Sequence, residues 1–123
     1  MRMFLLLLFF TLQTAVPRAQ AQDITPPSNI TDLFASSGTA AGMLDLSWSA
    51  PVDDANGGAL VDGWYRVDYS SESAHAFSSA TYLVQFPTTT APGRRERRGL
   101  SGLLGNVSYF LRVYSADDVP NFS

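Results

Sequence analysis

Cysteine is absent from this chain, which excludes disulfide bonds and thiolate metal sites. Lysine is absent as well, so every basic residue is an arginine. The sequence holds a single histidine, His75, and its only glutamates are Glu72 and Glu96. No spacing pairs any of these three with a nucleophile or with a second carboxylate. We therefore expect no catalytic residue, no cofactor and no enzyme activity.

Long apolar runs are missing too, except for one near the start. Arg2 is followed by the run Phe4–Leu12 (FLLLLFFTL) and then by the small-x-small triplet Ala19–Ala21. This order is typical of a secretory signal peptide, so we predict that residues 1–21 are cleaved and that the chain is secreted to an extracellular location. A membrane anchor is the alternative, but the run has about half of the ~20 apolar residues that a spanning helix needs. We expect no transmembrane segment after signal removal.

The predicted mature chain, Gln22–Ser123, can bury one hydrophobic core of a domain of about 100 residues. Its six arginines face eleven acidic residues, which gives a formal charge of −5. Such acidity favours solubility and argues against a nucleic-acid partner. The balance predicts one small extracellular domain whose partner is a protein.

Alternation of apolar and polar residues dominates the rest of the chain. Residues 22–29, with their proline pair, predict an extended lead-in to a domain over residues 30–123. Period-2 patterns predict the following strands: Ile30–Ala35, Met43–Trp48, Gly63–Ser70, Ala80–Phe86 and Ser108–Ser115, with Arg94–Leu100 as an edge strand. We expect Pro87 to close the strand before it. Short strands separated by turn signals predict an all-β antiparallel sandwich.

Several short motifs, each weak alone, follow one another in a specific order over nearly all of the mature chain. They are Pro26-Pro27, Ile30-Thr-Asp-Leu33, Leu46-Ser-Trp48-Ser-Ala-Pro51, Asp53-Asp54, Tyr65-x-Val67-x-Tyr69-Ser70, Leu103 with Tyr109, and Leu111-x-Val113. Their order and spacing resemble a fibronectin type III domain, which is an immunoglobulin-like antiparallel sandwich. The variant is similar to modules of bacterial secreted proteins and of animal calcium-activated chloride-channel regulators.

The resemblance implies structural roles for several of these residues. It places Trp48 at the centre of the core and makes Tyr109 a tyrosine corner, whose hydroxyl bonds backbone at a bend, with Leu103 beneath it. The structural core that follows from the resemblance and the alternation is Trp48, Tyr65, Val67, Leu103, Tyr109 and Leu111.

The chain departs from the family pattern at three places. Gly105 stands where the family often has a proline, and Arg94–Arg98 replaces an alternating polar and β-branched strand. The last strand of the family would follow Asp117–Ser123, where the sequence stops. We expect a sandwich that lacks its last strand, in which the Ser108–Ser115 strand has an unpaired edge, either because the chain is a fragment or because a partner supplies a strand.

The loop Asp53–Gly58 is a partial fit to a calcium site. Asp53, Asp54 and Asn56 supply oxygen atoms, but Gly58 stands where a third ligand belongs and no bidentate glutamate follows. A solvated connection between strands is the expected state, and we assign no metal site.

The arginine cluster Arg95, Arg97 and Arg98 matches the R-x-R-R pattern that secretory proprotein convertases cleave. The same arginines suit contact with a polyanion, or serve as a charged edge that discourages strand-to-strand aggregation. We expect all of them to be exposed in each case, since several guanidinium groups beside one glutamate are costly to bury.

Asn29, Asn106 and Asn121 each begin an Asn-x-Ser/Thr triplet, so each is a candidate glycosylation site in a eukaryotic secretory pathway. The sequence predicts an extracellular non-catalytic spacer or protein-interaction module. The alternative is an accessory module of a larger secreted enzyme or chloride-channel regulator whose active part lies outside residues 1–123.

Overall fold

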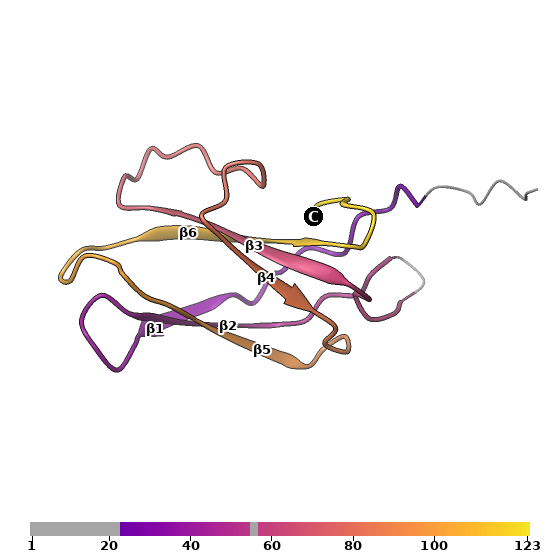
Figure 1. Ribbon diagram of the computed structural model, residues 1–123, viewed down its shortest axis with the longest axis horizontal. Helices are drawn as coiled ribbons and strands as arrows, with labels where there is room; N and C mark the ends of the chain where they lie inside the picture. Colours follow the sequence, from indigo (N-terminus) through magenta and orange to yellow (C-terminus); the bar gives the residue numbers. More distant parts are fainter. Residues whose placement is uncertain (1–22, 55–56) are drawn as a thin grey trace, which may run out of the picture.

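The structure is a computed structural model that describes residues 23–54 and 57–123. The predicted signal peptide therefore lies outside the described residues. The described part holds six strands and no helix: β1 Phe34–Ser37, β2 Leu44–Ser49, β3 Gly63–Ser70, β4 Val84–Thr88, β5 Arg95–Leu100 and β6 Phe110–Ala116 (Figure 1). Accordingly, no helix in these residues is long and apolar enough to cross a membrane.

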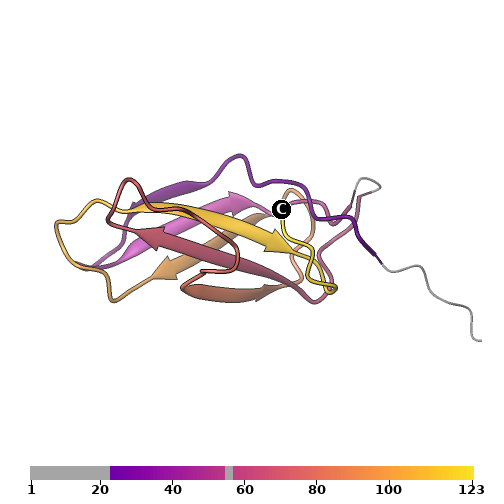
Figure 2. The same cartoon turned by 90° about the horizontal axis from the view of Figure 1, so that it is seen from above.

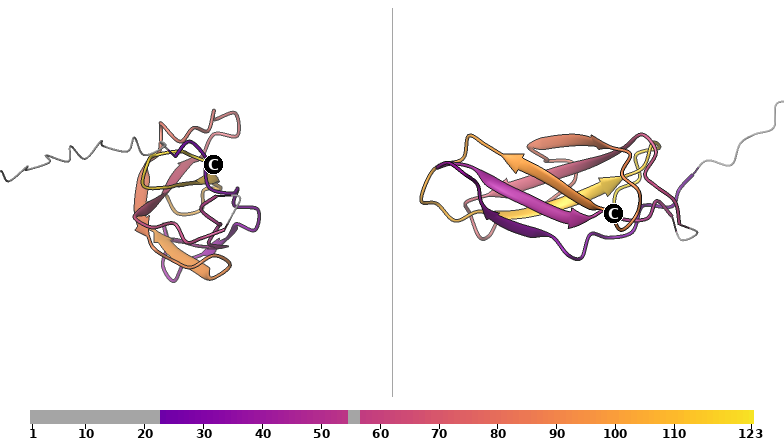
Figure 3. Two further views of the ribbon diagram at one scale, coloured as in Figure 1. Left: turned by 90° about the vertical axis from the view of Figure 1, so that its right-hand side faces the viewer. Right: turned by 90° about the horizontal axis from the view of Figure 1, so that it is seen from below.

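The strands form two antiparallel sheets with the orders β1-β2-β5 and β4-β3-β6. The two sheets are the two layers of the molecule (Figures 2 and 3). The prediction of an all-β antiparallel sandwich is confirmed. The edge strand expected at Arg94–Leu100 is confirmed as β5, which pairs only with β2.

The core lies between the sheets and follows from alternation. In β2, Leu46 and Trp48 point inward while their neighbours face outward, and Tyr65 and Val67 do the same from β3. Trp48 is 0 % exposed and meets the Tyr65 ring edge to face, with 4.9 Å between ring centroids. Burial of a large apolar side chain of this kind contributes roughly 1.5–3 kcal/mol. Trp48 therefore holds the central place that was predicted for it.

Tyr109 lies just before β6 and fastens the preceding bend. Its hydroxyl accepts a hydrogen bond from the Leu104 backbone amide at 2.9 Å, and its ring meets Tyr69 edge to face. Leu103 and Leu111 are half-buried at the border of the core. The backbone bond expected of Tyr109 is present, with Leu104 as the donor.

Two predicted strands are displaced. The strand expected at Ile30–Ala35 begins only at Phe34, because Ile30 and Leu33 lack period-2 spacing and pack singly against the core. The strand expected at Ala80–Phe86 begins at Val84 and continues through Pro87. An edge strand tolerates a proline whose nitrogen faces away from the ladder, so the expectation that Pro87 ends this strand is wrong.

Candidate functional site

The outer face of the β1-β2-β5 sheet carries a hollow of about 480 Å³ that several polar side chains line. Asp45 and Ser47 reach it from β2, Arg95 and Arg97 from β5, and Phe34 from β1. The antiparallel register sets Ser47 opposite Arg97 and Ser49 opposite Arg95, so the two arginines project on the solvent side. Phe34 is 59 % exposed beside them.

Arg95 is held in place by an ion pair across the sheet. Its guanidinium donates to Asp32 Oδ2 at 2.6 Å and to Ser47 Oγ at 3.0 Å. Asp32 also accepts the Ser49 backbone amide and the Ser49 hydroxyl. The Ser49 amide is the main reason that the pKa of Asp32 lies below its usual value, and the Ser49 hydroxyl and Arg95 add to the effect. This network holds one wall of the hollow in place. The Asp32 carboxylate neutralises the positive charge of Arg95.

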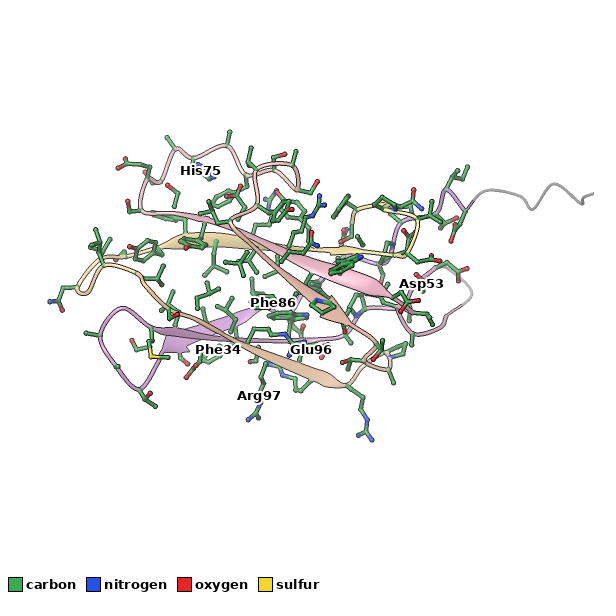
Figure 4. All side chains as sticks on the ribbon, in the orientation of Figure 1. Phe34, Asp53, His75, Phe86, Glu96 and Arg97 are labelled. Carbon is green, nitrogen blue, oxygen red and sulfur yellow. The ribbon has the colours of Figure 1, made fainter. Side chains whose placement is uncertain are left out.

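Arg97 extends away from the domain (Figure 4). Within residues 23–54 and 57–123, no hydrogen bond, ion pair or ring contact engages its guanidinium group. The hollow therefore presents the uncommitted guanidinium of Arg97 next to one exposed aromatic ring, with the Asp45 carboxylate also in its lining.

Arg98 and Glu96 point the other way, toward the core, which corrects the expectation that the whole arginine cluster is exposed. Glu96 lies opposite Trp48 in the ladder and is 4 % exposed. It accepts the Thr88 hydroxyl at 2.6 Å and pairs with Arg98 at 3.1 Å, and the Arg98 guanidinium lies over the Phe86 ring. Because strand side chains alternate, one arginine of the R-x-R-R pattern is turned inward.

The candidate calcium loop does not assemble a metal site in the described part of the chain. Asn56 lies outside the described residues, and no group of three or more His, Asp or Glu side chains among those described is arranged to hold a metal ion. Burial and the nearby carboxylates of Asp117 and Asp23 raise the pKa of Asp53 above its ordinary value. This end of the molecule is acidic, and the loop is a connection between β2 and β3.

The three candidate glycosylation sites differ in exposure. Asn29 and Asn106 are exposed, whereas Asn121 is half-buried. The Asn121 amide nitrogen, which would carry a glycan, donates to Asp117 Oδ2 at 2.7 Å and to the Asp23 carbonyl. Among the residues that the structure describes, only Asn29 and Asn106 of these three sites present an exposed amide on a surface loop.

Sequence reasoning missed a buried carboxylate beneath His75. Asp68 in β3 is 1 % exposed, and both of its carboxylate oxygens lie 3.0 Å from His75 Nε2. Burial alone would raise the pKa of Asp68, but the Ser78 amide, His75 and the Thr81 hydroxyl hold that pKa below its ordinary value. These contacts tie the loop after β3 to the sheet. The alternation of β3 places Asp68 on the outer face of the sheet, away from the core. The sequence pattern gave no sign that the loop after β3 folds back and buries this carboxylate.

No family description and no curated protein sequence matches the chain.

Proposed function

We propose that the chain is an extracellular, non-catalytic protein-interaction module or spacer with a fibronectin type III-like fold. The strand order supports this fold, because β1-β2-β5 beside β3-β6 parallels the A-B-E and C-F strands of immunoglobulin-type sandwiches. The hydrogen bond between Tyr109 and the Leu104 amide supports it as well. The signal-like residues 1–21 support an extracellular location.

The single observation that carries the binding role is the uncommitted guanidinium of Arg97 beside the exposed Phe34 ring. Arginine and aromatic side chains are enriched among the residues that dominate protein–protein binding. An acidic segment of a partner protein fits this hollow, since a carboxylate pairs with Arg97 while an apolar neighbour packs on Phe34.

The test is a binding titration with a synthetic peptide of alternating aspartate and leucine. Arg97→Ala should weaken binding by about tenfold or more, as expected for loss of a charge-assisted hydrogen bond. Arg94→Ala is the matched control, because Arg94 is exposed but lies outside the hollow. Equal affinity of the Arg97→Ala variant and the original chain would overturn the assignment. Preferential capture of a sulfated oligosaccharide would identify a polysaccharide contact instead.

A further inference from the structure

The hollow on the β1-β2-β5 sheet is built from two rows of side chains that cross the three strands. The register aligns one residue of each strand in the first row: Phe34, Ser47 and Arg97. The second row lies two positions further along each strand: Ser36, Asp45 and Gly99. Serine and glycine fill little space, so the hollow is bordered by the larger members of the two rows, which are an aromatic ring, a guanidinium group and a carboxylate.

The Asp45 carboxylate reaches across the hollow toward β5. Its Oδ1 lies 3.9 Å from the point where a Cβ atom on Gly99 would stand. Because Gly99 has no side chain, it leaves this carboxylate uncovered on the β5 side. In the part of the chain that the structure describes, residues 23–54 and 57–123, no hydrogen bond or ion pair engages Asp45. Asp45 is also exposed to solvent.

Two opposite charges thus face the same hollow without neutralising each other. Arg97 and Asp45 lie on adjacent strands, two positions out of register. Diagonal neighbours of this kind are about 7–8 Å apart at their Cα atoms. Phe34 is a diagonal neighbour of Asp45 on the other side, from β1. A ligand that carries only negative charge would gain a contact at Arg97 and be repelled by Asp45.

We propose that the hollow binds an extended protein segment in which an acidic and a basic residue stand two positions apart. This inference rests on the proposed function and names the charge pattern of the partner segment. Side chains at positions i and i+2 of an extended chain share one face and lie about 6.8 Å apart. That spacing matches the diagonal between Arg97, which pairs with the acid, and Asp45, which pairs with the base.

The next side chain on that face of the segment, at position i+4, lies toward Phe34. The segment therefore has the pattern acidic-x-basic-x-apolar. Asp45 is the residue that selects the basic position, because it attracts a cation there and repels a second carboxylate. Selection of this kind combines a favourable contact with a repulsive one.

The experiment titrates the 123-residue chain with two acetylated, amidated peptides of identical composition. The matching peptide is Ser-Glu-Ser-Lys-Ser-Leu-Ser, and the comparison peptide is Ser-Glu-Lys-Ser-Ser-Leu-Ser. In the comparison peptide the lysine points away from the face that carries the glutamate. The matching peptide should bind about fivefold more tightly, the upper range for an exposed charge pair. Both peptides have the same net charge, so the acidity of the whole chain affects them equally.

Three variants assign this preference to its residues. Asp45→Asn should weaken binding of the matching peptide until the two peptides have equal affinity. Asp62→Asn is the control, because Asp62 is exposed outside the hollow and asparagine tolerates its φ of 53°. This control should keep the fivefold preference. Arg97→Ala should weaken binding of both peptides.

The possible failures separate this inference from the proposed function. Equal affinity of the two peptides for the original chain, with both weakened by Arg97→Ala, would overturn the inference and leave the proposed function standing. The inference also fails if Asp45→Asn keeps the preference, or if it strengthens binding of both peptides alike, since Asp45 would then compete for Arg97. Absence of binding by these peptides and by the aspartate–leucine peptide would overturn the proposed function and the inference together.

Discussion

At the scale of single residues, Asp68 shows how a buried charge organises a loop that has no regular structure. The carboxylate accepts hydrogen bonds from the Ser78 amide and the Thr81 hydroxyl, and His75 Nε2 lies within 3.0 Å of both oxygens. These partners come from residues that the sequence presents only as a polar Ser/Ala-rich stretch. Their joint effect exceeds the cost of burial, because the pKa of Asp68 is lowered in the folded chain.

This lowered pKa predicts a dependence of stability on pH. The folded chain favours ionised Asp68 more than the unfolded chain does, so the contribution is complete above the ordinary value of 3.8. It is lost as the pH falls through the lower folded pKa. Asp68→Asn should reduce the free energy of unfolding at pH 7 by about 2 kcal/mol, the scale of hydrogen bonds to a buried charge.

Urea denaturation at a series of pH values measures this difference. The difference in free energy of unfolding between the original chain and Asp68→Asn should become smaller as the pH falls below 3.8, where the carboxylate takes up a proton. Asp45→Asn is the control, because Asp45 is exposed on the outer face of β2 and should show little change. A constant gap between pH 7 and pH 2 would show that the ionised carboxylate is not what holds the loop.

At the scale of elements, the R-x-R-R cleavage motif lies within β5, an edge strand of a sheet. Residues Arg95–Leu100 pair with β2 along their whole length. Arg98, which would occupy the position before the cut bond, lies over Phe86 and pairs with buried Glu96. A protease has to pull this side chain out and detach the strand before it can cleave.

We therefore predict that a proprotein convertase leaves the folded chain uncut after Arg98 and cleaves the chain once it is unfolded. Gel electrophoresis and mass spectrometry of timed digests measure the rate in buffer and after heat denaturation. Trypsin gives an internal comparison, because Arg94 lies in the turn before β5 and should be cut before Arg98. Fast cleavage after Arg98 in the folded chain would contradict the pairing of β5.

The element scale also shows what the sequence could and could not predict. The predicted strand Gly63–Ser70 coincides with β3, because its aromatic and β-branched residues alternate without interruption. The displaced strands at Phe34 and Val84 lacked such alternation. The inward turn of Glu96 was missed because charge argues for exposure, whereas the register sets Glu96 opposite Trp48 and supplies Thr88 and Arg98 as partners.

At the scale of the whole molecule, charge is distributed unevenly over an acidic chain. The guanidinium groups of Arg95 and Arg97 lie on the outer face of one sheet, while Asp117 and Asp23 lie close enough to Asp53 at one end to raise its pKa. An acidic partner would be repelled from the acidic end. This polarity could not be predicted from the sequence, because its members are far apart in the chain.

Exposure predicts which candidate glycosylation sites are used when the chain is made in a eukaryotic secretory host. Asn29 and Asn106 should carry glycans, and Asn121 should not, because its amide nitrogen is bonded to Asp117 and Asp23. Mass spectrometry of peptides before and after glycosidase treatment locates the sugars. Asn29→Gln and Asn106→Gln together should abolish the mass shift. A remaining glycan at Asn121 would contradict the hydrogen bonds from the Asn121 amide to Asp117 and Asp23.

Asn29 also lines a groove of about 370 Å³ together with Val113 and Tyr114 of β6. A sugar chain attached there would stand beside this edge of the β4-β3-β6 sheet and act as a hydrophilic fence against unwanted strand pairing. The same polypeptide made in a bacterium would lack that fence. Its tendency to self-associate should then depend on the host that produced it, although the amino-acid sequence is identical.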